Sequence, residues 1–335
     1  MTVTIRVAQV PAPGAPFEIV EVPVPEPDRG QVRVAVQACG VCHTDAAFVY
    51  AGFPNLTFPL IPGHEIAGRV DAIGDGVDTW AVGDRVAVGW FGGNCGQCRC
   101  CREGDLLHCT KLQVPGWAYP GGYAEHLVVP VSALARVPDA LPDVAAAPLS
   151  CAGVTVFNAL RHSDATPGDL VAVLGLGGLG HLGVQFATKL GFETVTIERG
   201  HEKADLGLGL GAHHVIDSDA EDVAAALQRL GGARVILATA ANADAMSGTV
   251  DGLAPRGQLM VLGAVPEPIN VSPIQLISAS RSVQGRSSGT ARDVEDTLQF
   301  AALTGVRAHV EQMPLDQAGD AFARMMSGQA RSAWC

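Results

Sequence analysis

The spacing of apolar residues changes about halfway along the chain, and the change predicts two kinds of domain. Up to about residue 150, segments such as 31–37 and 82–88 alternate apolar and polar positions between glycine and proline turns. Short alternating strands of this kind are typical of a β-rich, partly barrel-like domain. From Leu170–Leu174 onward, short and wholly apolar runs alternate with helical patterns. This pattern is typical of βαβ units, whose parallel strands are buried on both faces.

These patterns predict an α/β protein in which a doubly wound parallel sheet domain accompanies the β-rich domain. We expect residues 1–152 to form the β-rich domain and residues 153–288 to form the parallel sheet domain. Residues 289–335 look helical and then extended, and we expect them to return to the first domain.

A glycine-rich turn follows the apolar strand 170–174 and precedes an amphipathic helix. In this context a G-x-G-x-x-G turn predicts dinucleotide binding, because its glycines let the backbone approach a pyrophosphate at a helix amino terminus. Glu198 ends the next strand, where an acid is expected to bind a ribose diol. The predicted coenzyme-binding turn consists of Gly175, Gly177, Gly178, Leu179 and Gly180.

A second motif is a cluster of cysteines within one loop of the β-rich domain. Cys95, Cys98, Cys101 and Cys109 have the spacing C-x2-C-x2-C-x7-C, which lets one loop surround a tetrahedral zinc ion. Four protein ligands close such a site to substrate, so its role is structural. Cys100 is the alternative ligand in this register. Disulfides or an iron–sulfur cluster are the competing interpretations, and a chain without a secretory signal favours metal.

A third set of candidates is spread along the chain: Cys42 in Cys42-His43-Thr44-Asp45, His64 before Glu65, and Cys151. One histidine and two cysteines form a three-ligand zinc set that leaves the fourth position open, which marks a catalytic zinc. Taken singly each residue is weak evidence, because a lone buried cysteine is more often a small core residue than a ligand.

Composition limits the partners that we expect. The net charge of −12 offers no basic stripe for nucleic acid. The amino terminus lacks a secretory signal pattern, and we see no apolar run of membrane-spanning length. We therefore expect a cytoplasmic protein that acts on a small molecule, without a nucleic-acid or membrane partner.

Together and in this order, the three motifs resemble those of the zinc-dependent medium-chain alcohol dehydrogenases, most closely the yeast and bacterial tetrameric branch. The similarity covers essentially the whole chain. It implies a GroES-like catalytic domain, a Rossmann domain, two zinc ions per chain and a homotetramer, with a homodimer as the alternative. It also implies reversible hydride transfer between a primary or secondary alcohol and NAD(P)+, through a zinc-bound alkoxide, to give an aldehyde or ketone.

The resemblance assigns roles around the catalytic zinc, which Cys42, His64 and Cys151 are expected to hold. Thr44 matches the hydroxyl that takes the alcohol proton. Asp45 matches the carboxylate that orients the ligand histidine, a frequent arrangement at zinc sites. Glu65 matches an acid that approaches the zinc during ligand exchange.

The coenzyme and substrate also have expected contacts. His43 matches a cationic contact to the pyrophosphate, Lys203 matches a ribose contact, and Thr155 matches a residue against the nicotinamide. Phe53 and Trp90 are expected to form walls of the alcohol pocket, although either could simply be a core residue.

The chain departs from the family pattern at three places. Ala47 replaces a histidine that ends a proton relay in many relatives, so the proton is expected to pass from Thr44 through the ribose hydroxyls to water. The usual phosphate-binding arginine is missing near Ala333. Arg199 follows Glu198 and could accommodate NADP(H), whereas the carboxylate favours NAD(H).

Several alternatives remain within and outside this family. One is a polyol or other secondary-alcohol dehydrogenase, against which Cys151 counts, because polyol enzymes tend to carry a carboxylate there. A zinc-free quinone or enoyl reductase generally lacks both cysteine motifs. A non-catalytic redox or regulatory protein that binds dinucleotide is the alternative from another class.

Overall fold

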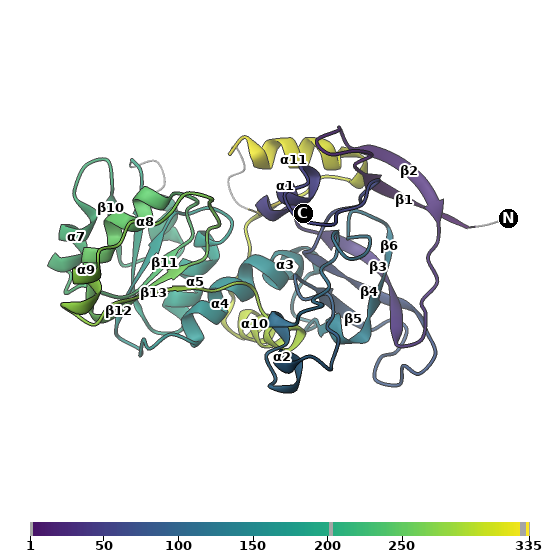
Figure 1. The fold of residues 1–335 in the computed structure, drawn as a ribbon, viewed down its shortest axis with the longest axis horizontal. Helices are drawn as coiled ribbons and strands as arrows, with labels where there is room; N and C mark the ends of the chain where they lie inside the picture. The colour runs from purple at the N-terminus through teal and green to yellow at the C-terminus, as the bar shows by residue number, and fades with distance from the viewer. Residues whose placement is uncertain (1–2, 201–203, 329–332, 335) are drawn as a thin grey trace. The chain divides into compact units, whose positions relative to one another are not determined.

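The computed structural model describes residues 3–200, 204–328 and 333–334. The chain divides into two compact units, of which the first comprises residues 1–154 and 288–335 and the second residues 155–287. The boundaries expected from the sequence differ from these by one or two residues. In Figure 1 the labelled strands β10 to β13, within residues 214–285, belong to the second unit, and the labelled strands β1 to β6, within residues 4–130, belong to the first unit.

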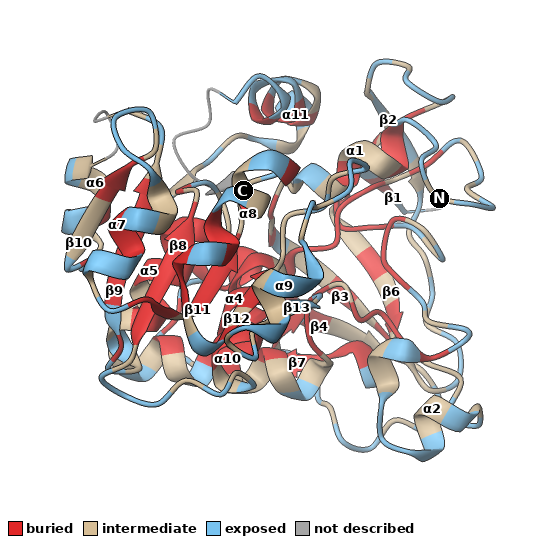
Figure 2. Cartoon of the chain, turned by 60° about the vertical axis from the view of Figure 1, so that its left-hand side comes forward, coloured by how far each residue is buried: buried red, intermediate tan, exposed pale blue. Residues whose placement is uncertain are grey.

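The second unit is built on a parallel sheet of six strands in the order β10-β9-β8-β11-β12-β13. Numbered along this unit the order is 3-2-1-4-5-6, which is that of the Rossmann dinucleotide-binding fold. All five residues of β8 are buried, as expected from its apolar run; Figure 2 shows it in red. The strands are β8 (Leu170–Leu174), β9 (Glu193–Glu198), β10 (His214–Asp217), β11 (Ala233–Ala238), β12 (Leu253–Val261) and β13 (Ser282–Gly285).

Helices connect these parallel strands, as βαβ units require. The helix α5 follows the glycine-rich turn directly, in agreement with the sequence pattern. The helices of this unit are α4 (Val154–Arg161), whose first residue lies in the other unit, α5 (Gly180–Lys189), α6 (Ala204–Gly209), α7 (Val223–Arg229), α8 (Ala243–Thr249), η4 (Val250–Gly252) and α9 (Pro273–Ile277).

The first unit is β-rich, and its main sheet has the order β6-β3-β4-β5-β7 with antiparallel pairing throughout. Alternate residues of β3, such as Val32 and Val34, are buried in one core with Ile66 and Leu127. The strands are β1 (Thr4–Gln9), β2 (Glu18–Pro23), β3 (Gln31–Cys39), β4 (Ile66–Ile73), β5 (Arg85–Val88), β6 (His126–Pro130), β7 (Ala135–Arg136), β14 (Val310–Glu311) and β15 (Ala333–Trp334).

Short helices join these strands, and two of them carry candidate site residues. The helix α1 begins one residue after Cys42, and the π-helical turn η3 contains Cys151. The helices of the first unit are α1 (His43–Val49), α2 (Arg99–Arg102), η1 (Leu106–His108), η2 (Val131–Ala133), α3 (Asp143–Pro148), η3 (Leu149–Gly153), α10 (Ala291–Thr304), η5 (Leu315–Gln317) and α11 (Ala318–Met326).

The sequence analysis predicted no apolar stretch long enough to span a membrane, but the structure contains one helical stretch that is long and apolar enough. The helical stretch Asp143–Arg161 passes that test by length and composition, yet 83% of its most apolar window is buried inside the protein. Burial of this kind is typical of a core helix. The stretch was missed because Pro148 interrupts it, and proline normally ends or kinks a helix.

Candidate active site

Four polar side chains meet in the first unit, and three of them are the predicted catalytic zinc ligands. The ligand atoms of Cys42, His64, Glu65 and Cys151 all lie within 4.8 Å of one another. His64 is fully buried, and its Nε2 atom has no hydrogen-bond partner among the described residues. A buried imidazole nitrogen without a partner is costly unless something else binds it. Two thiols and an imidazole are the donor set that zinc takes, so these residues fit a zinc ion.

The pairing of two strands explains how distant residues reach one place. β3 and β4 are antiparallel, and Cys39 at the end of β3 pairs with Ile66 at the start of β4. The backbone N–H of Gly40 donates to the carbonyl of Glu65 at 2.8 Å, which extends this pairing. Cys42 therefore leaves the sheet at the same edge where His64 enters it.

Cys151 reaches the cluster from a π-helical turn, Leu149–Gly153. The Ser150 side chain in this turn donates to the carbonyls of Ala147 at 2.7 Å and Val88 at 3.3 Å, and the second bond ties the turn to the end of β5. A Cβ on Gly89 would lie 2.1 Å from the Ser150 carbonyl oxygen, so only glycine permits this approach. The sequence analysis did not predict the π turn, a feature often found at functional sites.

Asp45 lies behind the ligand histidine, as the resemblance implied. It is fully buried, and its Oδ1 atom lies 3.0 Å from Nδ1 of His64. Because a carboxylate accepts hydrogen bonds, Nδ1 carries the proton and the Nε2 lone pair is available to a metal. The Oδ2 atom accepts from the Cys42 backbone N–H and from the Tyr123 hydroxyl, each at 3.0 Å. The sequence analysis did not single out Tyr123. The glycines Gly121 and Gly122 directly before it are the one feature of the sequence that draws attention to this position.

The electrostatics of the cluster favour positive charge at its centre. A hydrogen bond from Cys151 and the charge of His64 hold the pKa of Cys42 well below its usual value, although burial opposes them. Burial lowers the pKa of His64, but the negative charges of Asp45 and Cys42 outweigh it and raise that pKa well above its ordinary value. Burial and the charge of Cys42 raise the pKa of Glu65. A cation would relieve the repulsion among these anionic groups.

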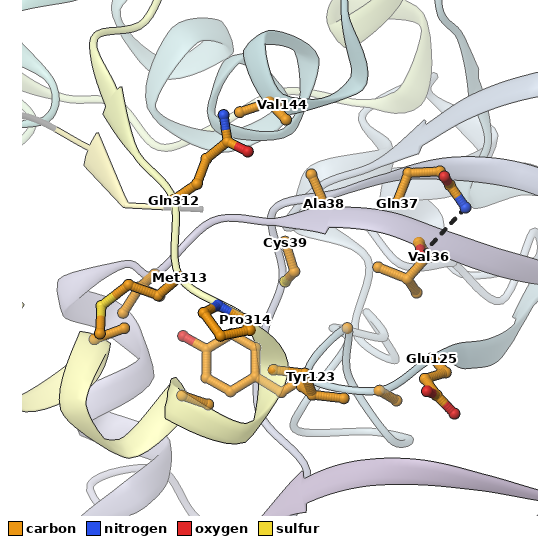
Figure 3. Close-up of a pocket in the computed structure, with 16 residues that line it drawn as sticks. Val36, Gln37, Ala38, Cys39, Tyr123, Glu125, Val144, Gln312, Met313 and Pro314 are labelled. Carbon is orange, nitrogen blue, oxygen red and sulfur yellow. Dashed lines mark hydrogen bonds between the residues drawn. The ribbon is translucent and has the colours of Figure 1, made fainter.

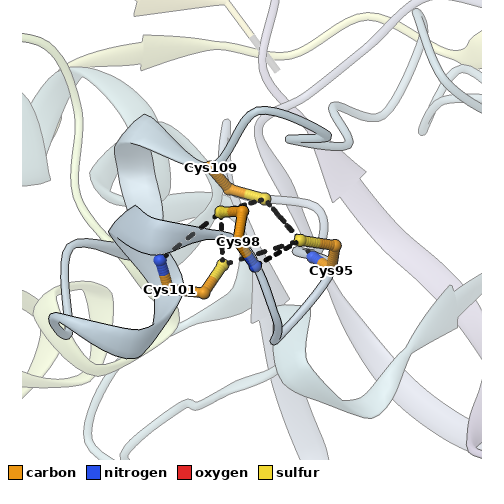
Figure 4. Close-up of side chains that lie close together, drawn as sticks. All are labelled: Cys95, Cys98, Cys101 and Cys109. Carbon is orange, nitrogen blue, oxygen red and sulfur yellow. Dashed lines mark hydrogen bonds between the residues drawn. The ribbon is translucent and has the colours of Figure 1, made fainter.

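The four predicted structural cysteines come together in a second cluster (Figure 4). The Sγ–Sγ distances are 3.5 Å for Cys98–Cys101 and Cys95–Cys109, 3.9 Å for Cys98–Cys109 and 4.0 Å for Cys95–Cys101. Zn–S bonds of about 2.3 Å in a tetrahedron place sulfurs about 3.8 Å apart, so one zinc ion fits. A disulfide needs about 2.05 Å, which these distances exclude. Cys100, the alternative ligand, lies outside the cluster.

The loop backbone prepares two of these sulfurs, those of Cys95 and Cys98, for metal binding. The N–H groups of Cys98 and Cys101 donate to the sulfurs of Cys95 and Cys98 at 3.4 and 3.5 Å. Hydrogen bonds from the Cys101 and Thr110 backbone lower the pKa of Cys98 to about 6. A thiol with a lowered pKa is more often in the thiolate form, which is the form that binds metal.

The glycine-rich turn of the second unit has the geometry that a coenzyme phosphate needs. Gly175 has a φ of 93°, and a Cβ on Gly180 would lie 1.7 Å from the Gly175 carbonyl oxygen. A Cβ on Gly177 or Gly178 would meet nothing within 4 Å, so their backbone faces open space. Leu179 is the residue before α5, at the helix amino terminus.

The predicted ribose-binding residues lie at the end of β9. The Glu198 carboxylate accepts a hydrogen bond from the Leu176 backbone N–H, which ties it to the glycine-rich turn. Arg199 is exposed. Thr155 is buried at the start of the second unit, and Lys203 lies outside the described residues.

Two aromatic rings, those of Phe48 and Trp90, pack against the ring of His64. Trp90 meets the His64 ring edge-on at 5.5 Å, and Phe48 stacks on Trp90 at 6.1 Å. Phe53 packs on Phe48 at 5.4 Å and on Trp117 at 4.8 Å. The predicted pocket residues Phe53 and Trp90 therefore belong to a larger aromatic group, which sequence reasoning missed because Phe48 and Trp117 lie outside any motif.

The first turn of α1 carries two more predicted residues. His43 is exposed and Thr44 is partly buried, directly after the ligand Cys42. Ala47 lies one turn further along the same helix. Its methyl group can neither release nor accept a proton, so this position contributes no relay group.

Comparisons with known proteins place the chain in a family. The family model described as alcohol dehydrogenase GroES-like domain matches residues 28–139, and that described as zinc-binding dehydrogenase matches residues 178–302. The chain is 43% identical over 318 residues to the alcohol dehydrogenase patD of Penicillium expansum, with 95% of this chain and 93% of that protein covered.

Solved structures are similar over nearly the whole chain. A cinnamyl alcohol dehydrogenase of Sorghum bicolor has a TM-score of 0.90 and 30% identity, with 99% of this chain and 97% of that chain covered. An NAD-dependent alcohol dehydrogenase has a TM-score of 0.90 and 25% identity, with 98% and 99% covered.

Proposed function

Because this chain belongs to the zinc-dependent medium-chain alcohol dehydrogenase family, we propose that it oxidises alcohols and reduces carbonyls at Cys42, His64 and Cys151. The observation that carries the proposal is the buried Nε2 atom of His64, which has no hydrogen-bond partner within the described part of the chain, in a cluster whose ligand atoms, two thiols among them, lie within 4.8 Å of one another. When bound, zinc supplies the positive charge that lowers the pKa of an alcohol, and the nicotinamide accepts the hydride.

The residues of this chain hold the reacting groups in place. Asp45 fixes the ring of His64 and its tautomer. The aromatic group of Phe48, Phe53, Trp90 and Trp117 presents an apolar wall beside His64, which keeps water from the alcohol and favours an apolar substrate. We propose primary alcohols, aromatic or of medium chain length, as the preferred substrates.

The proton leaves through Thr44. Its hydroxyl follows the ligand Cys42 in α1, and Ala47 offers no group to receive the proton further along the helix. Release to solvent then depends on external bases, so the rate should rise with buffer concentration. Ala47→His would supply an internal base and should weaken this dependence; an unchanged dependence would contradict the route.

We propose a second, structural zinc ion bound by Cys95, Cys98, Cys101 and Cys109, which gives two zinc ions per chain. The sulfur spacing close to a tetrahedral edge supports it. Metal analysis should find two zinc ions per chain in the native protein and one after Cys42→Ser.

We propose that the coenzyme is NAD(H). The Glu198 carboxylate is tied to the glycine-rich turn, so a 2′-phosphate bound there would meet a negative charge. Arg199 is exposed at the next position, which leaves NADP(H) as the alternative.

An initial-rate assay tests the whole proposal. Alcohols from ethanol to benzyl alcohol, a polyol and the corresponding carbonyls would be run with NAD(H) and with NADP(H). Turnover of apolar alcohols that is abolished by Cys42→Ser, or by chelation, is expected. Turnover of the polyol alone would favour a polyol dehydrogenase, and coenzyme binding without any turnover would favour a regulatory protein.

The assembly and location of the protein are also proposals. The family resemblance supports a homotetramer, which light scattering of the purified protein would test against a homodimer. The cysteines of both clusters are free thiols, the form that binds zinc. Thiols stay reduced in the cytoplasm, so we propose that the protein is cytoplasmic.

A further inference from the structure

We propose that Tyr123 is a positioning residue for the catalytic zinc and acts on it through Asp45 and His64. The inference rests on the proposed function, because it requires zinc at Cys42, His64 and Cys151. The hydroxyl of Tyr123 donates a hydrogen bond to Asp45, and Asp45 in turn holds the ring of His64.

The buried carboxylate needs the hydroxyl of Tyr123. Asp45 has no exposed surface, and a buried carboxylate is strongly destabilised unless donors surround it. Its Oδ2 atom has two donors, the Cys42 N–H and the Tyr123 hydroxyl. Without the Tyr123 hydroxyl, Oδ2 would keep only the hydrogen bond from the Cys42 backbone N–H, which belongs to the predicted zinc-binding loop itself. The carboxylate would then be free to turn and to release the His64 ring from its orientation.

The backbone attaches Tyr123 to the loop that carries His64. The N–H groups of Gly121 and Tyr123 donate to the carbonyls of Ile61 and Pro62 at 2.8 and 3.0 Å. Gly63 precedes His64, has a φ of 102°, and a Cβ there would lie 2.6 Å from the Tyr123 ring. The ring therefore packs directly against the residue before the ligand.

Packing alone does not fix the ring on all sides. Tyr123 also lines a cavity of about 210 Å³, together with Cys39, Met313 and Pro314 (Figure 3). A ring that faces a cavity has room to shift when its hydrogen bond is lost. The hydrogen bond of the hydroxyl therefore acts together with the packing against Gly63 to hold the ring beside Asp45.

The experiment measures release of zinc from the full-length protein to a colorimetric chelator. Two phases are expected, and the phase that Cys151→Ser abolishes belongs to the catalytic site. Tyr123→Phe should speed this phase roughly tenfold or more, as expected for a change behind a metal ligand, and leave the other phase unchanged. Tyr119→Phe is the matched control, because it removes a hydroxyl that donates to the Gly92 carbonyl at 2.8 Å instead.

A double-mutant cycle shows whether Tyr123 acts through Asp45. In an Asp45→Asn background, Tyr123→Phe should add much less than it does alone, because the carboxylate that it orients is gone. If Tyr123→Phe does not fold by circular dichroism, Tyr123→Met tests the same link, because it also removes the hydroxyl that donates to Asp45 and keeps an apolar side chain in the core; it should also speed the catalytic phase.

The outcomes separate the two proposals. A catalytic phase unchanged in a folded Tyr123→Phe, while Asp45→Asn speeds it, would overturn this inference and leave the proposed function intact. Full additivity in the cycle would also overturn it. If Cys151→Ser abolishes neither phase, the proposed zinc site itself is wrong.

Discussion

At the scale of single residues, the candidate site combines side chains that can bind a metal with side chains that hold them in place. The motifs singled out the predicted ligands and Asp45, which holds His64, but not Tyr123. Cys42, His64 and Cys151 have side chains whose chemistry marks them in any sequence. Tyr123 and Phe48 have no such mark, because a tyrosine before a strand or a phenylalanine in a helix is most often part of the core. Their importance follows from distances to Asp45 and Trp90, which spacing along the chain does not encode.

The choice of coenzyme is a prediction at this scale. Glu198→Gln removes a negative charge from the ribose end of the glycine-rich turn and keeps the side chain's shape. The ratio of kcat/KM for NADP(H) to that for NAD(H) should rise roughly tenfold, which corresponds to about 1.4 kcal/mol. Parallel kinetics with both coenzymes would measure it.

The matched control for this variant is Glu193→Gln at the opposite end of β9, where the carboxylate contacts His214 at 2.6 Å. It should leave the ratio unchanged. Equal ratios in the wild type and Glu198→Gln would show that this carboxylate does not select the coenzyme.

At the scale of elements, strand ends carry the site, and the sequence predicted most of them. The end of β3 leads to Cys42, β8 leads to the glycine-rich turn, and β9 ends at Glu198, all close to the expected places. The helix around Pro148 was not foreseen. Local preference favours a break at proline, and burial of the surrounding alanines in the core outweighs it.

The cysteine loop gives a prediction at the scale of an element. Cys101→Ser should remove one zinc ion per chain and make residues 95–109 sensitive to protease, because α2 is only four residues long and depends on the metal. Cys100→Ser should keep both zinc ions, since its sulfur lies outside the cluster. Metal analysis and limited proteolysis measure the two effects; zinc loss in both variants would mean that Cys100 also binds the ion.

At the scale of the whole molecule, chemistry is divided between the two units. Both candidate metal-binding clusters lie in the first unit, and the glycine-rich turn lies in the second. The alternating and continuous apolar patterns predicted this order of units, because each pattern reflects a different kind of sheet. The pairing of β14 with β15 was beyond prediction, since strands of two residues carry no periodicity.

This division predicts separate responses to metal and coenzyme. Chelation of zinc should speed hydrogen exchange in segments 40–65, 95–109 and 149–153 of the first unit, because those ligand loops lose the bound ion. NAD(H) should slow exchange at residues 175–180 and 198. Mass spectrometry of peptides measures both, and protection of the cysteine loop by NAD(H) alone would contradict the division.

The π-helical turn at Cys151 also has a meaning for how such a site arises. A π turn is an α-helix with one extra residue, and each residue of an α-helix rotates its side chain by about 100°. Deleting one residue from Leu149–Gly153 would restore a regular helix and turn the Cys151 position away from His64. The gain or loss of a single codon here therefore decides whether this segment contributes the third ligand of a metal site or is an ordinary core helix. The rest of the sequence need not change.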